Sequence, residues 1–182
     1  MKRYFKAVII AVAMSFALSA SSFAGSGTRL NEDDIAPNFT LKNILTDEEV
    51  TLTDYRGKKI VLIQFWATWC ALCKREIPFL VNHYNENKKR DDFEILAVLL
   101  PSGKNDKRDV KEIVEKYNIP YPILLDADKK LAEEKYGLTG FIPVLLFIDK
   151  DGKIYYEHTG ELSASEDIIE MVLEELRGEV EE

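Results

Sequence analysis

Two cysteines separated by two residues, Cys70 and Cys73, are the side chains of this sequence best suited to redox chemistry. They follow a continuous apolar run and precede a stretch with helical spacing, so the pair is expected where a buried strand turns into a helix. Unpaired backbone N–H groups and the helix dipole stabilise a thiolate there, which favours Cys70 as the attacking sulfur. Cys73, one turn further along on the buried side, can resolve a mixed disulfide.

Three other interpretations of the pair stay open. A purely structural disulfide would close a very small loop and add little stability. A zinc half-site would need further ligands, and neither His83 nor His158 has metal-site spacing to the cysteines. Two inert buried thiols are the third interpretation. We favour redox chemistry from the spacing and its context, and we expect no bound metal and no cofactor.

The elements expected to position the pair alternate between strand and helix, which is typical of a compact α/β sandwich. Asp151-Gly152 between two apolar runs predicts a hairpin, and residues 163–166, Ser-Ala-Ser-Glu, fit a capping box that begins the last helix. We expect strands over residues 39–41, 50–52, 59–66, 93–100, 122–125, 144–148 and 153–157, and helices over residues 70–87, 107–117, 129–136 and from 163 onward.

The first 24 residues have the pattern of a secretory signal peptide. A basic start precedes an apolar run over residues 7–18, and Ser22-Phe23-Ala24 places small residues where a signal peptidase cleaves. The run is shorter than the roughly 18 residues typical of a spanning helix, although an uncleaved anchor or a buried N-terminal helix are alternatives. We therefore expect export to the periplasm or another extracytoplasmic space. Residues 25–34 are predicted to be a flexible lead-in, and residues 35–182 one domain.

Length and charge exclude several classes of protein. The chain has 182 residues, of which 46% are hydrophobic and 31% charged, as expected of one globular domain. Cleavage removes Lys2, Arg3 and Lys6, which takes the net charge from -8 to -11. An acidic protein is a poor partner for nucleic acid, and two cysteines cannot form a disulfide-rich scaffold.

Several segments resemble one known family. Residues 65–73, Phe-Trp-Ala-Thr-Trp-Cys-Ala-Leu-Cys, resemble the thioredoxin active-site segment, and Pro78 falls where thioredoxins carry a helix-kinking proline. Residues 36–39, 52–58, 73–78, 136–143 and 149–154 resemble, in the same order, segments of TlpA/ResA-like exported thiol-disulfide oxidoreductases. The resemblance covers nearly the whole mature chain.

This resemblance implies a fold and an activity. The fold is a thioredoxin-like α/β sandwich with a central mixed sheet flanked by helices, an N-terminal hairpin, and a helix–strand insert over about residues 101–126. The activity is reduction of disulfides in client proteins, for example in cytochrome c maturation or metal-site assembly. A membrane thiol reductase supplies the electrons in such relatives, and we expect a monomer here.

The resemblance also implies the roles of the site residues. Pro143 is expected to follow a cis peptide bond beside Cys70, and Ile142 to offer backbone groups to a client strand. Trp69 is expected to form an apolar lip. Glu76, three residues after Cys73, is a third catalytic candidate whose partly buried carboxyl can hold a raised pKa and move protons. A solvated acid in the first turns of the helix is the alternative.

Four other residues near the predicted site also have expected roles. Gln64 replaces a buried acid of thioredoxin and is expected to be a hydrogen-bonded amide. Trp66 is expected to pack beneath the site. Leu72 replaces the usual proline, which restores an N–H that could point towards the Cys70 sulfur. Val144 removes a hydroxyl from the groove.

Other functions use the same residues. A disulfide oxidase or isomerase would differ from a reductase only in the reduction potential of the cysteine pair. A thiol peroxidase usually has a threonine three residues before its cysteine, whereas Thr68 is two residues before Cys70. A copper carrier usually spaces its cysteines by three residues and adds a histidine.

Overall fold

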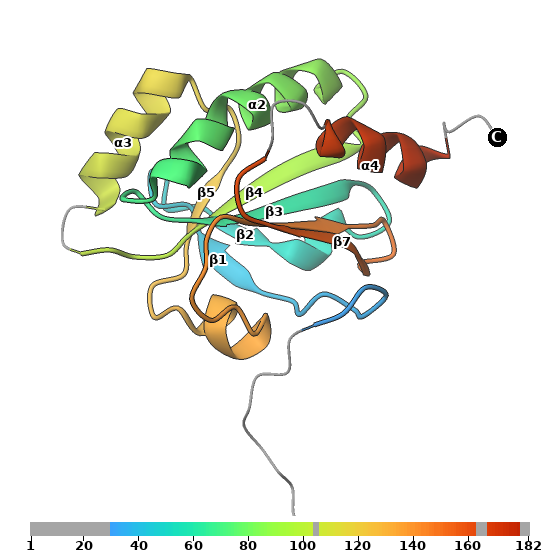
Figure 1. Ribbon diagram of the computed structural model, residues 1–182, viewed down its shortest axis with the longest axis horizontal. Coiled ribbons are helices and arrows are strands. Elements are labelled where there is room, and N and C mark those ends of the chain that lie inside the picture. The colour runs from blue at the N-terminus through green and yellow to red at the C-terminus, as the bar shows by residue number, and fades with distance from the viewer. Residues whose placement is uncertain (1–29, 104–105, 163–166, 179–182) are drawn as a thin grey trace, which may run out of the picture.

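The computed structural model describes residues 30–103, 106–162 and 167–178, and its centre is a mixed sheet in the order β5-β4-β3-β6-β7 (Figure 1). The predicted signal peptide and residues 25–29 lie outside this range. The strands are β1 (Thr40–Lys42), β2 (Glu49–Thr51), β3 (Ile60–Trp66), β4 (Phe93–Leu99), β5 (Ile123–Leu125), β6 (Val144–Ile148) and β7 (Ile154–Thr159). The helices are α2 (Ala71–Asn87), α3 (Asp106–Tyr117) and α4 (Ile168–Arg177), with short turns η1 (Leu52–Tyr55) and η2 (Leu131–Lys135).

The central strand β3 is buried along its whole length because both faces of the sheet are covered. It pairs parallel to β4 and antiparallel to β6. Its side chains alternate between two hydrophobic cores: Leu62 and Trp66 belong to one, and Ile63 and Phe65 belong to the other. The continuous apolar run in the sequence is therefore explained by a strand between two cores.

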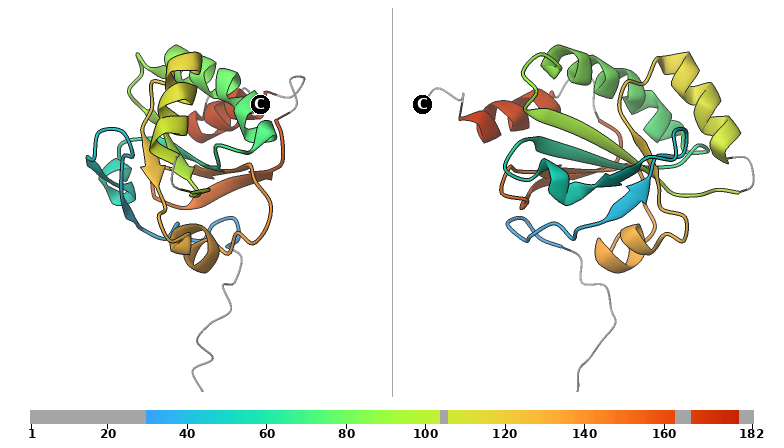
Figure 2. Two further views of the ribbon diagram at one scale, coloured as in Figure 1. Left: turned by 90° about the vertical axis from the view of Figure 1, so that its left-hand side faces the viewer. Right: turned by 180° about the vertical axis from the view of Figure 1, so that it is seen from behind.

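Helices α2, α3 and α4 cover one face, and the N-terminal segment, η1 and η2 cover the other (Figure 2). The predicted insert is present: α3 returns the chain so that β5 adds to the sheet edge parallel to β4. This arrangement confirms the predicted mixed sheet flanked by helices. Within the described part of the chain, no helix combines the length and hydrophobicity needed to cross a membrane.

Two predicted elements differ from the structure, the segment at residues 129–136 and the start of the last helix. Residues 129–136 form one wide turn rather than a regular helix: the Tyr136 N–H bonds to the Leu131 carbonyl, five residues back. The Asp126 carboxylate accepts the N–H groups of Leu131 and Ala132 and so fixes the start of this turn. The predicted N-terminal hairpin is present: β1 pairs antiparallel with β2, each strand is shifted by one residue from the prediction, and the buried Phe39 still accepts the Leu52 N–H next to the pair.

The last helix begins later than expected. Asp167 is its N-cap, and the Asp167 carboxylate accepts the Glu170 N–H at 3.1 Å. The predicted capping box at residues 163–166 lies outside the described residues. At the other end of α4, the guanidinium of Arg177 bonds to Asp92 and Asn87, which ties this helix to the start of β4 and the end of α2.

Candidate active site

Cys70 and Cys73 form a disulfide at the N-terminus of α2, with an S–S distance of 2.10 Å. Cys70 is the N-cap of the helix, and its Sγ accepts the backbone N–H of Cys73 at 3.1 Å. Cys70 exposes 5% of its surface and Cys73 none. An attacking disulfide or thiol therefore reaches the Cys70 sulfur before that of Cys73.

A second segment, 72 residues away in the chain, meets the disulfide. Strands β3 and β6 are antiparallel, so the end of β3 and the start of β6 lie at the same edge of the sheet. The peptide bond between Ile142 and Pro143, just before β6, is cis, as predicted. The Ile142 carbonyl oxygen lies 3.8 Å from Cys70 Sγ, so the backbone before β6 borders the sulfur.

Exposed apolar side chains adjoin these two segments. Trp69, directly before Cys70, is 66% exposed, and Leu72 is 38% exposed. Phe141, 81% exposed, was missed by the sequence analysis, although its place directly before Ile142 and Pro143 was the available signal. Large exposed apolar groups beside a reactive sulfur form a surface suited to another protein.

Glu76 lies on the second turn of α2 and is almost fully buried, with 1% exposure. Its Oε1 accepts the Leu162 N–H at 2.9 Å, and its Oε2 accepts the Gln64 Nε2–H at 3.4 Å. Burial raises the pKa of Glu76 to about 7, although both hydrogen bonds act in the opposite direction. The alternative of a solvated acid is therefore wrong, and Gln64 is the hydrogen-bonded buried amide that was expected.

Two further expectations concern Leu72 and Trp66. The N–H that reaches the Cys70 sulfur belongs to Cys73, which corrects the role suggested for Leu72. Trp66 is buried, as expected, and its indole N–H has no hydrogen-bond partner among the described residues. The Thr68 hydroxyl pairs with the Ser102 hydroxyl at 3.1 Å.

Among the residues that the structure describes, no group of three or more histidine, cysteine or acidic side chains is arranged to hold a metal ion.

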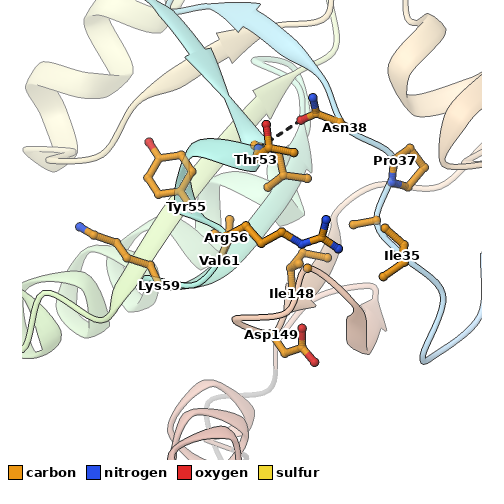
Figure 3. A pocket seen from close by; sticks show the side chains of 13 residues that line it. Ile35, Pro37, Asn38, Thr53, Tyr55, Arg56, Lys59, Val61, Ile148 and Asp149 are labelled. Atoms are coloured by element: carbon orange, nitrogen blue, oxygen red, sulfur yellow. Dashed lines mark hydrogen bonds between the residues drawn. The ribbon is translucent and has the colours of Figure 1, made fainter.

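A separate cavity of about 220 Å³ lies at the opposite end of the sheet (Figure 3). It is bordered by the start of β3 and the end of β6, and the side chain of Arg56 extends across it. The Arg56 Nε–H donates to the Asp151 carbonyl at 2.5 Å. None of the predicted site residues lines this cavity, so the redox chemistry belongs to the other end of the molecule.

Comparison with known proteins places these features in context. The profile of the AhpC/TSA family matches residues 33–157. Thiol-disulfide oxidoreductase ResA of Geobacillus thermodenitrificans is 34% identical over 161 residues, which cover 88% of this chain and 87% of the relative. ResA of Bacillus subtilis is 29% identical over 158 residues, covering 87% and 83%.

Solved structures agree with the sequence matches. A crystal structure of a putative thiol:disulfide interchange protein DsbE from Chlorobium tepidum superposes with a TM-score of 0.69 and 26% identity, covering 81% of this chain and 99% of that one. A putative protein disulfide isomerase from Bacteroides thetaiotaomicron gives a TM-score of 0.70 and 25% identity, covering 81% and 91%.

Proposed function

The chain belongs to the AhpC/TSA family and is a thiol-disulfide oxidoreductase of the ResA and DsbE type, and from this premise we propose that it reduces disulfides of client proteins outside the cytoplasm. The observation that carries the proposal is the Cys70–Cys73 disulfide at the start of α2, with its more exposed sulfur beside the Ile142 carbonyl. That placement supports attack by one sulfur and resolution by the other.

In the proposed cycle, the reduced protein gives two electrons to the client. The Cys70 thiolate attacks one sulfur of the client disulfide, forming a Cys70–client mixed disulfide and releasing the other client sulfur as a thiolate. The Cys73 thiolate then attacks Cys70 Sγ. This step closes the Cys70–Cys73 disulfide, breaks the mixed disulfide and releases the second client thiolate, which takes up a proton.

Substrate contact is assigned to the two segments that border the sulfur. The backbone of Ile142, presented by Pro143, would bond to an extended client segment in the manner of an added strand. Trp69 would cover the apolar side chains of that segment, since most of its ring surface is free. Main-chain bonds tolerate many client sequences, which suits a reductase that acts on several proteins.

Glu76 is assigned the proton transfers at Cys73. A carboxyl with a pKa of about 7 exists in both protonation states near neutral pH, as a proton donor and acceptor requires. Gln64 cannot titrate, and its N–H holds one carboxylate oxygen of Glu76 in place.

The cellular setting is also part of the proposal. The basic start, apolar run and small residues up to Ala24 support export, with cleavage or retention of the segment as an anchor. A membrane thiol reductase would return the electrons, and the protein would act as a monomer. Clients in cytochrome c maturation or metal-site assembly would present a pair of cysteines as a disulfide.

The direction of electron flow is tested by the reduction potential of the Cys70–Cys73 pair in glutathione and thioredoxin buffers. We expect a reduction potential of about -270 mV or lower, as for thioredoxin. A reduction potential of about -120 mV would identify an oxidant instead. A pair that does not oxidise and reduce reversibly would rule out both redox functions.

Clients are tested by trapping. The Cys73→Ser variant cannot resolve mixed disulfides, so client proteins should remain attached to Cys70 and be released by dithiothreitol. The matched control is Cys70→Ser, which lacks the attacking sulfur and should trap far less. Equal recovery from both variants would contradict the assigned roles.

A further inference from the structure

Three residues between β7 and α4 contact α2: Glu161, Leu162 and Asp167. The guanidinium of Arg75 makes a two-pronged ion pair with the Glu161 carboxylate, with Nη2 at 2.7 Å from Oε2. The next residue, Leu162, donates its N–H to Glu76. Asp167 lies 3.1 Å from Nε2 of His83. The ion pair and the bond to Glu76 therefore involve adjacent residues on both segments.

This contact separates Glu76 from an open hollow. The hollow, about 660 Å³, is bordered by α2, α3 and the segment after β7. Arg75, Glu161 and Leu162 line it, whereas Glu76 does not and is 1% exposed. The two charged side chains and the Leu162 backbone thus stand between solvent in the hollow and the buried carboxyl.

We propose that the Arg75–Glu161 ion pair is a latch that holds Leu162 over Glu76 and keeps water away from its carboxyl. Arg75 and Glu161 are then positioning residues that act on the redox pair through Glu76. The effect of the latch on the redox pair rests on the proton-transfer role proposed for Glu76. The effect of the latch on water at the Glu76 carboxyl does not depend on that role, so it can be measured without any client.

The groups that face Glu76 determine the sign of the effect. Burial is the largest cause of its raised pKa, and the negative charge of Glu161 raises it further. Gln64 from β3 and the Leu162 N–H lower it. Tyr121, which precedes β5, also interacts with Glu76, but burial raises the pKa of this phenol far above neutrality, so it stays uncharged.

Two substitutions separate hydration from charge. In Glu161→Gln, the loss of the negative charge and the entry of water both lower the pKa of Glu76. In Arg75→Gln, Glu161 keeps its charge while the latch is broken, so only the entry of water can lower the pKa. A purely electrostatic role for the pair predicts no change or an increase in Arg75→Gln.

The test is a carbon-13 NMR titration of the Glu76 carboxyl in the disulfide form, with Glu76→Gln to assign the signal. We expect a midpoint near 7 in the parent protein and a fall of at least about one pH unit in Arg75→Gln. The double variant Arg75→Glu with Glu161→Arg re-forms the ion pair and should restore slow exchange of the Leu162 amide, but not the parent midpoint, because the charge at position 161 is reversed. Arg108→Gln, which removes another exposed arginine ion pair on α3, is the matched control and should change nothing.

Hydrogen exchange gives a second readout. The Leu162 amide should exchange at least tenfold faster in Arg75→Gln than in the Arg108→Gln control, while amides of β4 keep their protection. An unchanged or raised Glu76 midpoint in Arg75→Gln, or unchanged exchange at Leu162, would overturn the latch. Failure to reduce clients would leave these two measurements unaffected, so the two proposals fail separately.

Discussion

The carboxyl of Glu76 is the buried acid next to the redox pair, and its protonation is linked to folding. Its pKa is about 7 in the folded protein, because of burial, against an ordinary value of 4.5. At pH values between 4.5 and about 7, the Glu76 carboxyl therefore keeps its proton in the folded protein but has lost it in the unfolded chain. The contribution of Glu76 to the free energy of unfolding is fully present below about pH 4.5 and is lost as the pH rises through about 7.

Glu76→Gln should remove this part of the pH dependence. The amide oxygen can still accept the Leu162 N–H, and no charge is buried at high pH. We expect the variant to match the parent near pH 4 and to be more stable by about 3 kcal/mol at most at pH 8, since one pKa unit corresponds to about 1.4 kcal/mol. Urea unfolding of the disulfide form across this range measures the difference.

The control is Glu174→Gln, which neutralises an exposed acid of α4. It should follow the parent at every pH. A Glu76→Gln variant with the parent's slope between pH 5 and 8 would show that the buried carboxyl does not titrate in this range.

Gly152, in the turn between β6 and β7, cannot be replaced without cost for two separate reasons, backbone strain and crowding. Gly152 has φ +85°, a conformation that side chains disfavour, and a Cβ there would lie 2.8 Å from Nε of Arg56. Gly160, at the other end of β7, has φ +103° but no neighbour within 4 Å of a Cβ. The two positions therefore separate backbone strain from crowding.

Gly160→Ala should destabilise the protein by about 1–2 kcal/mol through strain alone. Gly152→Ala should cost about 1 kcal/mol more, because the methyl group displaces Arg56 from its bond to Asp151. Thermal unfolding of both variants measures the costs. In an Arg56→Ala background the two substitutions should become equal; a persistent difference would place the crowding elsewhere.

Elements with a strong local signal could be predicted from the sequence. The runs that became β3 and β4 are apolar except for Gln64 and Glu94, and the Asp-Gly signal predicted the β6–β7 turn. The turn at residues 129–136 could not be predicted from hydrophobic spacing, because the Asp126 carboxylate shapes it through side-chain bonds to the Leu131 and Ala132 N–H groups, which no such pattern signals. The N-terminal hairpin was predictable to within one residue, because apolar and polar residues alternate through Phe39 and β1.

The candidate site was predictable to the extent that its residues are close in sequence. Cys70, Cys73 and Glu76 lie within two helical turns, so their spacing was visible. Two groups that act on Glu76 were not predictable, because Leu162, which donates a hydrogen bond, and Glu161, which acts through its charge, come from a distant segment with no motif. The pairing of Ile142 with Cys70 came from the family resemblance and not from spacing.

The whole molecule has two distinct ends. The disulfide and the cis peptide bond lie where β3 ends and β6 begins, and the cavity crossed by Arg56 lies at the other end of these strands. The first described residues join this second end. Asp33 and Asp34 exchange backbone bonds with Ile154, and the Ala36 N–H bonds to Gly152.

Removing this segment should weaken the fold without changing the redox pair. A chain that begins at Pro37 loses three backbone hydrogen bonds to the β6–β7 hairpin and the buried Ala36, compared with one that begins at Gly25. We expect a loss of about 2–4 kcal/mol in urea unfolding, at about 1 kcal/mol for each bond. The reduction potential should stay the same, because the lost contacts are at the far end; a shifted potential would contradict this separation.

The attachment of the N-terminal segment to the β6–β7 hairpin also bears on how the protein can be handled. Residues 31–36 leave the domain at the end away from Cys70. A bead, electrode or fusion partner joined ahead of them would therefore sit behind the domain, with Trp69 and Phe141 turned towards the solution. Immobilisation through the N-terminus is accordingly the route that keeps the disulfide accessible in an affinity column or a redox sensor.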